Sequence, residues 1–364
     1  MGQAEHGEKI NRKAAFTASD AKVLIVDDNR VSLKVTKGLL GSYHMQIETA
    51  NSGEQAVEMV QCGAYDLVFM DYMMPGMNGV DAAKTIRGME GERYKKLVII
   101  ALSGNLEAEI RELFLEAGMN DFLHKPVERR SMDKILCKWL PEDMISLNQE
   151  ASGEEQQNKE KEDFSAWQMD GIDVETGMSY SDHDRALYVE VLTDFADSIE
   201  EKAGRIERTL QERDIPGYIL CVHSLKSAAR YLGAGTVADM AQMLEADAQK
   251  GDWQAVERET PELLCSYRKL YQSIAPYRIN RAYTGKRKSF DHKEVLALLE
   301  KLWLCMEEYD LEGGEEIVRA LEEYDLGKAW SERRDKIVRA VDQFNYEVCK
   351  EEALSWKAAL EKEL

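Results

Sequence analysis

Four apolar runs in the first third of the chain each lead into polar or charged side chains. The runs and the residues that follow them are Val23–Val26 before Asp27 and Asp28, Leu67–Met70 before Asp71, Val98–Leu102 before Ser103, and Phe122–Leu123 before Lys125. Short apolar runs of this kind predict the buried strands of a parallel sheet. In an open parallel sheet the carboxyl ends of the strands converge on one crevice, where such folds bind ligands. We therefore expect these polar side chains to lie together.

The spacing of strands and helices predicts the fold of residues 22–140. A weaker strand signal at 45–49 joins the four runs above, of which the last, at 121–123, is also weak, and makes a set of five. Helical patterns such as 53–62 and 106–117 separate the strands. Alternation of this kind favours helices on both faces of a parallel sheet. The fold class expected is an α/β doubly wound, five-stranded parallel sheet of the flavodoxin-like type.

Three carboxylates in one crevice predict a cation site. Like charges about 4 Å apart repel by roughly 4 kcal/mol at an effective dielectric constant near 20. A bound Mg²⁺ removes this conflict and prefers carboxylates, waters and phosphate oxygens. Carboxylates also form aspartyl phosphates, and Lys125 would add a second cation for the phosphoryl oxygens. The crevice is therefore predicted to be a Mg²⁺-dependent phosphorylation site with Asp71 as acceptor.

The order of these motifs resembles that of a response-regulator receiver domain. The matching pieces are Val-Asp-Asp-Asn at 26–29, Met-Asp-Tyr-Met-Met-Pro-Gly-Met-Asn-Gly at 70–79, Ala-Leu-Ser at 101–103 and Lys125-Pro126. The resemblance implies that Asp71 accepts phosphate and that Asp27, Asp28 and the backbone carbonyl of Met73 hold Mg²⁺ with it. It also implies that Ser103 and Lys125 contact the phosphoryl group, and that Phe122 is the aromatic switch residue.

The helical pattern changes after Pro141. Residues 142–170 are rich in charge without an apolar period, which is typical of a flexible linker. Beyond them strand signals vanish, and short breaks containing Pro or Gly separate four helical blocks. These are residues 184–212, 216–232, 235–250 and 252–276. Four helices joined by short turns predict an antiparallel bundle.

One histidine in the second helical block lies opposite its apolar stripe. At about 100° per residue, six apolar residues share an arc that faces away from His223, so His223 is expected to point out of the bundle core. They are Tyr218, Cys221, Val222, Leu225, Ala229 and Leu232. Lys226, Ser227 and Arg230 share the face of His223. This segment resembles histidine phosphotransfer domains, whose motif is His-x-x-Lys-Gly. The resemblance covers about 171–278 and implies that His223 is a phosphoacceptor assisted by Lys226, although Ser227 replaces the usual glycine.

Composition excludes several other classes of protein. The net charge of −21 is unfavourable for nucleic acid, whose binding depends on neutralising phosphates with Lys and Arg. No apolar run approaches the roughly 20 residues of a membrane span, and the first twenty residues lack the apolar core of a secretion signal. The 6 cysteines form no CxxC pair, which fits a reducing compartment. We expect a cytoplasmic protein that binds neither nucleic acid nor membrane.

The sequence thus divides into six segments with different expected roles. They are a polar N-terminal extension (1–20), a receiver domain (21–141), an acidic linker (142–170), a phosphotransfer bundle (171–278), a basic linker (279–288) and a helical module of unassigned role (289–364).

The function predicted is that of a two-component phosphorelay protein. Asp71 would be phosphorylated with Mg²⁺, and His223 would accept and pass on phosphoryl groups. The expected partners are a sensor or hybrid histidine kinase and other receiver domains. Because no Gly-rich ATP-binding boxes are present, the chain is not expected to be an enzyme. Similar receiver and phosphotransfer pairs end hybrid kinases, so it could be a detached tail of one.

An alternative function is a response regulator that acts as a phosphorylation-switched interaction module. In that case the C-terminal helices would be the output. The residues leave open the direction of phosphoryl flow and whether transfer occurs within one chain or between chains.

Overall fold

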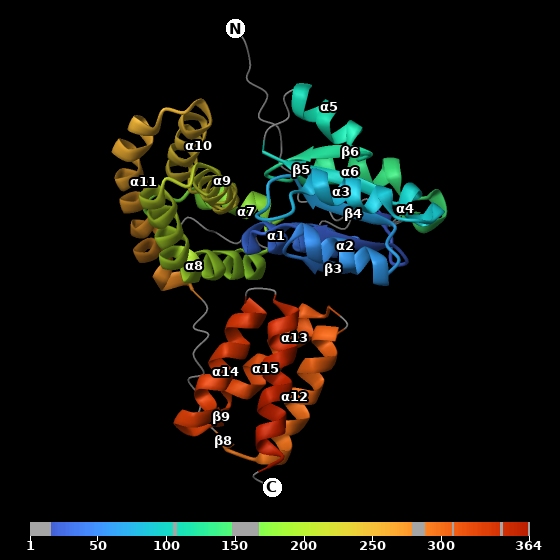
Figure 1. Cartoon of the computed structure of the whole chain (residues 1–364), viewed down its shortest axis with the longest axis vertical. Helices are drawn as coiled ribbons and strands as arrows, with labels where there is room; N and C mark the ends of the chain where they lie inside the picture. Colours follow the sequence, from blue (N-terminus) through green and yellow to red (C-terminus); the bar gives the residue numbers. More distant parts are fainter. Residues whose placement is uncertain are drawn as a thin grey trace, which may run out of the picture. The chain divides into compact units, whose positions relative to one another are not determined.

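A computed structural model of the chain describes residues 16–104, 108–147, 167–278, 288–307, 309–342 and 345–362. The chain folds into two compact units (Figure 1). The first contains residues 1–47 and 52–278, and the second contains residues 48–51 and 279–364. No helix in the described ranges is long and apolar enough to cross a bilayer.

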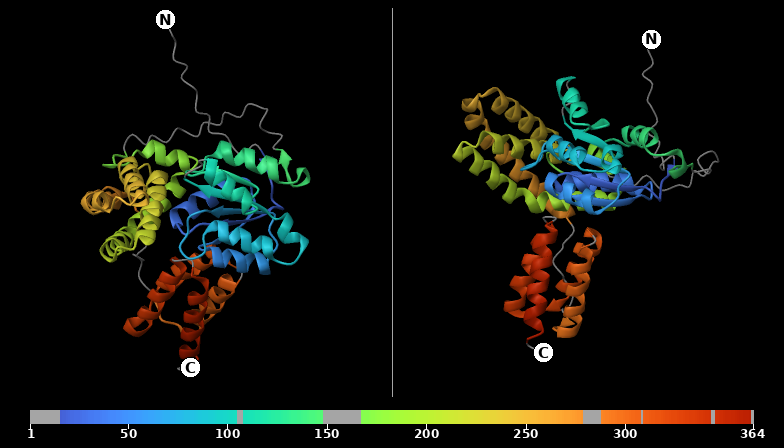
Figure 2. Two further views of the ribbon diagram at one scale, coloured as in Figure 1. Left: turned by 45° about the horizontal axis from the view of Figure 1, so that its top comes forward. Right: turned by 45° about the vertical axis from the view of Figure 1, so that its right-hand side comes forward.

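The N-terminal part of the first unit is a five-stranded sheet in the order β3-β2-β4-β5-β6. The strands are β2 Lys22–Val26, β3 Gln46–Ala50, β4 Leu67–Asp71, β5 Val98–Ser103 and β6 Asp121–His124. Strand β4 pairs in parallel with β2 and β5, and β5 with β6. The strand interiors are apolar and buried, and the chain reverses direction through helices on both faces (Figure 2). The predicted fold class is confirmed.

The helices of this domain begin at side chains that cap them. Asn29, Ser52 and Asn78 each accept a hydrogen bond from a backbone N–H of the first helical turn, as is usual for Asn and Ser at this position. The helices are α1 Arg30–Gly41, α2 Gly53–Cys62, α3 Gly79–Gly88, α4 Glu92–Lys96, α5 Ala108–Glu116 and α6 Arg129–Trp139. The α1 cap follows Asp27 and Asp28 directly, so the same short loop begins a helix and carries part of the site.

The structure around the sheet extends beyond the receiver boundaries expected from the sequence. A short strand β1 (Phe16–Thr17) pairs antiparallel with β7 (Ser146–Leu147). Phe16 is 1% exposed and packs on Tyr43 with ring centroids 5.1 Å apart. A 3-10 turn, η1, occupies Glu142–Met144, inside the segment expected to be linker. These pairings join residues distant in sequence, which a local pattern does not reveal. The rest of that linker, from 148 to 166, lies outside the described residues.

Over residues 167–278 the structure describes four long helices, one short helix and a final 3-10 turn, η4 (Ala275–Tyr277). The helices are α7 Val174–Tyr180, α8 Arg185–Glu212, α9 Ile215–Leu232, α10 Gly235–Lys250 and α11 Trp253–Ile274. Each long helix packs on the next, and α11 packs back on α8, which closes a four-helix bundle. Asp184, Asp214 and Asp252 cap three of the helices. The predicted helices agree with these bounds to within two residues, whereas α7 was not predicted.

Two glycines that end bundle helices offer a matched test of backbone strain and packing. Gly233 (φ 84°) and Gly251 (φ 80°) both have the left-handed backbone that favours glycine. A Cβ at position 233 would lie 2.1 Å from the carbonyl oxygen of Asp173, whereas nothing lies within 4 Å at position 251. Gly251→Ala should therefore lower the free energy of unfolding by about 1 kcal/mol, and Gly233→Ala by about 3 kcal/mol, since it adds a clash. Urea unfolding measures both losses; equal losses would refute the packing role of Gly233.

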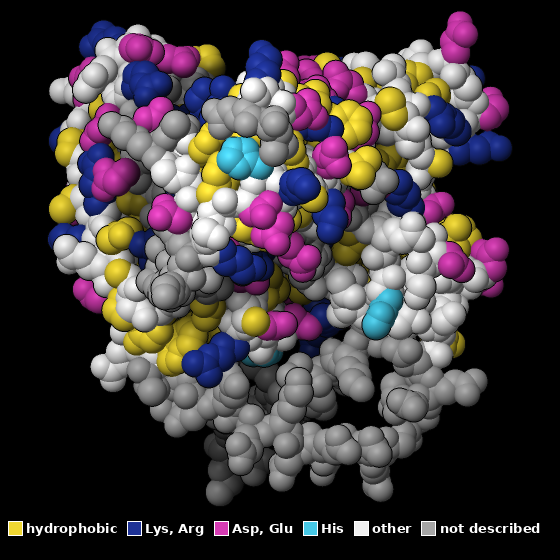
Figure 3. All heavy atoms as spheres, turned by 90° about the horizontal axis from the view of Figure 1, so that it is seen from below, with side chains coloured by type: hydrophobic (Ala, Val, Ile, Leu, Met, Phe, Trp, Pro, Cys, Tyr) yellow, Lys and Arg dark blue, Asp and Glu magenta, His cyan; other side chains and the backbone are white. Residues whose placement is uncertain are grey.

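The second unit contains a helical bundle that begins after the second expected linker, of which 279–287 lie outside the described residues. Its helices are α12 His292–Glu307, α13 Leu311–Glu322, α14 Gly327–Asp342 and α15 Tyr346–Leu360, and the short strands β8 Lys288–Ser289 and β9 Tyr324–Asp325 pair in parallel. Trp356 and Leu302 are fully buried in its core. On the face drawn in Figure 3, the described acidic and basic side chains are interspersed and form no single basic patch.

Candidate functional site

Three carboxylates gather at the C-terminal edge of the sheet. Asp27 and Asp28 follow β2, and Asp71 is the last residue of β4. Each offers an oxygen, and these oxygens lie within 4.8 Å of one another. Asp27 and Asp71 are buried and Asp28 is half-buried. The parallel register explains this convergence, because it aligns the ends of adjacent strands at one edge of the sheet.

Lys125 is the buried cation of this cluster. Its Nζ lies 2.9 Å from Asp71 Oδ2 and also donates to Asp27 Oδ2. Burial lowers the pKa of this lysine, but the charges of Asp27 and Asp71 outweigh burial and raise the pKa above its ordinary value. Burial raises the pKa of Asp71 to about 7 against the opposing effect of Lys125, and burial together with the charge of Asp27 raises that of Asp28 to about 6.

The cluster fits a small divalent cation. Lys125 pairs with Asp27 and Asp71, and the charges of Lys202 and Arg205 also act on Asp28, yet the pKa of Asp28 stays raised, so the negative charge is only partly compensated. Asp71 Oδ1 is buried and has no hydrogen-bond partner among the described residues. Buried oxygens are normally paired, and an unpaired carboxylate oxygen beside two further acids is a suitable ligand for Mg²⁺. The donor set therefore suits the predicted metal, and Asp27, Asp28 and Asp71 are the side chains that would hold it.

The other predicted site residues lie on the same loops and strands. Ser103 ends β5, is 2% exposed and lies opposite His124 in the parallel register. Met73 follows β4 by two residues and is half-buried. Phe122 on β6 is half-buried beneath Arg111, whose guanidinium carbon lies 4.8 Å from the ring centroid. Ser103 thus ends β5, and Met73 follows β4, at the C-terminal edge of the sheet where Asp71 lies.

A second group of ionisable side chains surrounds His223 on α9. The Nδ1 atom of His223 lies 2.7 Å from Glu245 Oε1, and the Nζ of Lys226 lies 2.6 Å from Glu245 Oε2. All three side chains are buried. Burial raises the pKa of Glu245, but its hydrogen bond to His223 and the charges of His223 and Lys226 more than offset burial and lower the pKa below its ordinary value.

This geometry fixes the tautomer of the imidazole. A carboxylate can only accept hydrogen bonds, so Nδ1 must carry the proton that points to Glu245. The lone pair is then at Nε2, which is the nucleophilic atom of the neutral ring. When Nε2 gains a substituent the ring becomes cationic, and Glu245 lies where it stabilises that charge.

The apolar stripe predicted for α9 is correct, and so is the prediction that His223 lies outside it. The stripe forms the bundle core, with Tyr218, Val222, Leu225, Ala229 and Leu232 buried. His223 points out of that core, as expected, yet it is only 5% exposed because the receiver covers it. A Cβ built at Gly104, next to Ser103, would lie 3.8 Å from His223 Cε1 and 3.6 Å from Lys226 Nζ.

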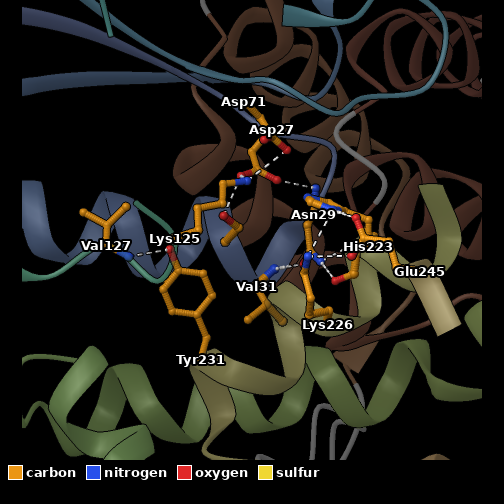
Figure 4. A network of polar contacts seen from close by, with 12 residues as sticks. Asp27, Asn29, Val31, Asp71, Lys125, Val127, His223, Lys226, Tyr231 and Glu245 are labelled. Carbon is orange, nitrogen blue, oxygen red and sulfur yellow. Dashed lines mark hydrogen bonds and ion pairs between the residues drawn. The ribbon is translucent and has the colours of Figure 1, made fainter. Parts of the chain in front are cut away.

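The histidine group and the acidic cluster therefore adjoin each other (Figure 4). His223 lies near enough to Asp71 that a positive charge on the imidazole lowers the pKa of the Asp71 carboxyl, in opposition to burial. Sequence reasoning missed Glu245, which lies on a different helix 22 residues from His223. The sequence shows only that Glu245 lies in an amphipathic helix, as do the other acidic residues of α10, so nothing distinguishes it from them.

Comparisons with known proteins match both domains. A family model described as a response regulator receiver domain matches residues 23–136, and one described as an Hpt domain matches residues 190–274. The sensor protein GacS of Pseudomonas syringae pv. syringae is 31% identical over 62% of this chain and 24% of its own length. The signal transduction histidine-protein kinase BarA of Shigella flexneri is 28% identical over 66% of this chain and 25% of its own length.

A solved receiver domain is also similar to the first domain. It belongs to the sensor histidine kinase PA1611 of Pseudomonas aeruginosa PAO1 and is described with a magnesium ion in its active site cleft. It is 35% identical, covers 33% of this chain and 96% of the solved chain, and gives a TM-score of 0.31.

These matches define the class of the two domains. Residues 23–136 are a response regulator receiver domain, and residues 190–274 are an Hpt domain. The chain therefore joins the two kinds of phosphotransfer module from which phosphorelays are built. It spans about a quarter of the length of the curated relatives, both of which are named as sensor proteins or kinases.

Proposed function

We propose that this chain carries phosphoryl groups between proteins, with Asp71 and His223 as the two acceptors. The observation that carries the proposal is the arrangement of the two sites. An imidazole whose Nδ1 is held by Glu245 adjoins a buried carboxylate that has Lys125 at one oxygen and an unpaired second oxygen among the described residues. Each group is a competent phosphoryl acceptor, and both are held in fixed orientation.

The residues of the receiver site would take distinct roles during phosphorylation of Asp71. Asp27, Asp28, Asp71 and the backbone carbonyl of Met73 would hold Mg²⁺, which would supply positive charge for the phosphoryl oxygens. Lys125 adds a second cation from the opposite oxygen of Asp71, and Ser103 contacts the phosphoryl group. Phe122 would respond to the change at the site as an aromatic switch. Such catalysis consists of positioning and charge stabilisation, so buried groups with fixed partners suit it.

The remaining expectations about partners and domains belong to this proposal. A sensor or hybrid histidine kinase would donate phosphoryl groups, and other receiver domains would exchange them with His223. The receiver would extend over 21–141 and the Hpt bundle over 171–278, joined through 142–170. Residues 1–20 would be a polar extension, 279–288 a basic linker and 289–364 a helical module whose role is unassigned. Kinase activity, which is named for BarA, is not part of this proposal, because this chain spans only about a quarter of the relatives' length.

The proposal is tested by following two kinds of covalent phosphate. The protein is incubated with Mg²⁺ and radiolabelled acetyl phosphate; alkali-labile label reports aspartyl phosphate, and alkali-stable, acid-labile label reports phosphohistidine. Asp71→Asn should abolish both labels, because Asp71 receives the phosphoryl group first. His223→Gln should abolish only the phosphohistidine label. His292→Gln, which changes a histidine at the start of α12, is the matched control and should leave both labels intact.

Two results would reject the proposal. Alkali-stable label that persists in His223→Gln would show that another residue is the acceptor. Label that stays on Asp71 and never reaches His223, even when a phosphorylated receiver or a kinase is supplied, would make the chain a phosphorylation-switched interaction module.

A further inference from the structure

The loop that joins β4 to α3 carries a proposed metal ligand that no substitution can remove. It follows Asp71 and contains Met73, whose backbone carbonyl would be the fourth protein ligand of Mg²⁺. A backbone carbonyl is present whatever the side chain, so its contribution depends on where the loop holds it. Groups that form a binding site must be held within about 0.5 Å of the productive geometry. The contacts that fix this loop therefore decide how well the carbonyl can bind a cation.

Backbone contacts fix the two ends of the loop. The N–H of Tyr72 donates to the carbonyl oxygen of Leu102 on β5 at 3.0 Å, and the N–H of Gly79 donates to the carbonyl oxygen of Tyr72 at 3.1 Å. The second of these bonds closes the loop on itself. A Cβ at Gly79 would lie 2.1 Å from the carbonyl oxygen of Asp71, so the start of α3 lies directly against the end of β4.

The first turn of α2 holds the loop between these ends. Glu54 Oε1 accepts a hydrogen bond from the backbone N–H of Met77 at 2.8 Å. Its neighbour Gly53 approaches the same residue, because a Cβ at position 53 would lie 2.4 Å from the carbonyl oxygen of Met77. Two successive residues of α2 thus lie against the N–H and the carbonyl of one loop residue. This contact fixes the backbone four residues after Met73.

The loop has a shape that admits the Glu54 carboxylate. Gly76 has a φ of 71°, in the left-handed region that favours glycine. A Cβ at Gly76 would lie 2.8 Å from Glu54 Oε1, which is closer than a carbon atom normally approaches an oxygen. The glycine at this position therefore permits both the turn of the loop and the approach of Glu54.

An acidic residue at this place also has an ordinary role. Glu54 lies in the first turn of α2, where a negative charge stabilises a helix through its dipole. That role requires no contact with the loop. It predicts that loss of Glu54 changes the stability of the protein but not its affinity for a cation, so the two roles can be distinguished by measurement.

We propose that Glu54 is a positioning residue for the Mg²⁺ site, because it holds the Met77 N–H and thereby the loop that presents the Met73 carbonyl. The inference rests on the proposed function, which assigns that carbonyl to the metal. Glu54 lies outside the cluster formed by the three aspartates, and it acts on the site through the backbone. Partners of this kind, which orient the groups that bind a metal, commonly raise its affinity.

The test titrates the full chain with MgCl₂ in a calorimeter. Loss of an orienting partner costs a metal site about 10- to 100-fold in affinity, and Glu54 is exposed, so Glu54→Ala should raise the Mg²⁺ dissociation constant about tenfold. Glu54→Gln keeps a neutral oxygen acceptor for a weaker bond and should raise it only about threefold. Glu58→Ala removes an exposed acid one turn further along α2 and should bind Mg²⁺ as the unmodified protein does.

Gly53 supplies a second variant, which keeps the Glu54 carboxylate. Gly53→Ala adds a Cβ against the Met77 carbonyl oxygen and should displace the loop, so its Mg²⁺ dissociation constant should also rise about tenfold. Gly88→Ala is the matched control. It lies at the end of α3, where an added Cβ meets nothing within 4 Å, and should leave Mg²⁺ binding as it is.

The rate of Asp71 labelling by acetyl phosphate gives an independent measurement. In Glu54→Ala the Mg²⁺ concentration that gives half the maximal rate should rise about tenfold, whereas the rate at saturating Mg²⁺ should fall by less than about twofold. A merely structural role would instead lower the maximal rate and leave the half-saturating Mg²⁺ concentration where it was. That second pattern would overturn the inference.

The remaining outcomes separate the inference from the proposed function. Equal losses of affinity in Glu54→Ala and Glu54→Gln, or in Glu54→Ala and Glu58→Ala, would reduce the effect to charge and overturn the positioning role, with Asp71 still the acceptor. If Asp28→Asn binds Mg²⁺ as tightly as the unmodified protein, the cation lies elsewhere, and both the inference and the proposed receiver site are overturned.

Discussion

Replacing Glu245 by glutamine is expected to slow phosphorylation of His223 by about a hundredfold. The Glu245 carboxylate accepts the Nδ1 proton of His223 at 2.7 Å and leaves the lone pair at Nε2. A glutamine can present its NH₂ group to Nδ1, which favours the other tautomer and places the proton on the atom that must attack. Orientation and tautomer control by a neighbouring carboxylate contribute about 10²- to 10⁴-fold in comparable imidazole chemistry.

The charge of Glu245 adds to this effect. Phosphorylated His223 is a cation, and Glu245 stabilises it in a buried setting where charge interactions are strong. The same substitution also leaves Lys226 without its partner at 2.6 Å. Glu245→Gln should therefore reduce both the rate of formation and the amount of phosphohistidine at equilibrium.

The measurement combines kinetics with a direct view of the ring. Phosphohistidine formation is timed with a phosphorylated receiver as donor, and ¹⁵N chemical shifts of the imidazole report which nitrogen is protonated. Lys226→Met is the matched control, because it removes the neighbouring cation but keeps the hydrogen bond between His223 and Glu245. It should preserve the tautomer. If Glu245→Gln keeps the Nδ1 proton and transfers within threefold of the unmodified protein, Glu245 has no positioning role.

The sheet and the bundle were predictable because their signals are local. Each apolar run that precedes Asp27, Asp71 or Ser103 is itself a strand, and parallel pairing then brings the strand ends together without further information. Helix ends in the bundle follow from the Asp caps and from glycines such as Gly233, which carry their conformational preference in the residue itself.

The features that escaped prediction depend on residues far apart in the chain. Asn29 and Ser224 are 195 residues apart, and nothing at either position indicates the other. The sequence pattern places His223 outside the bundle core but does not reveal that the receiver covers it. Strands β1 and β7 are two residues each, too short for a periodic signal. The site could thus be predicted as two separate halves, but not as one assembled contact.

Magnesium is expected to stabilise the unmodified protein, and Asp28→Asn should largely remove this response. A ligand that binds only the folded state stabilises it by about 2.7 kcal/mol at one hundred times its dissociation constant. For a domain of this size that corresponds to a rise in melting temperature of roughly 10 °C. Asp28 offers one of the three carboxylate oxygens of the cluster, so its loss weakens the cation site.

Without Mg²⁺ the order of stability should reverse. Asp28 and Asp27 repel each other, and burial adds to the cost of the charge on Asp28. Asp28 is half-buried, so solvent screens part of this repulsion, and Asp28→Asn should raise the free energy of unfolding in a chelating buffer by about 1 kcal/mol. The unmodified protein should therefore be the less stable of the two in chelator and the more stable in saturating Mg²⁺.

This reversal in the order of stability distinguishes a cation bound at Asp28 from a general effect of negative charge. Thermal unfolding is followed in chelator and in excess Mg²⁺ for the unmodified protein, Asp28→Asn and Glu58→Gln. Glu58 is an exposed acid on α2, so Glu58→Gln removes one negative charge without changing the cluster, and it should behave as the unmodified protein in both buffers. A Mg²⁺ response of equal size in all three would place the cation elsewhere. A response confined to the chains that retain Asp28 would show that the cation relieves the repulsion among the three carboxylates. In that case the Asp28 carboxylate destabilises the fold in chelator and stabilises it when the ion is bound.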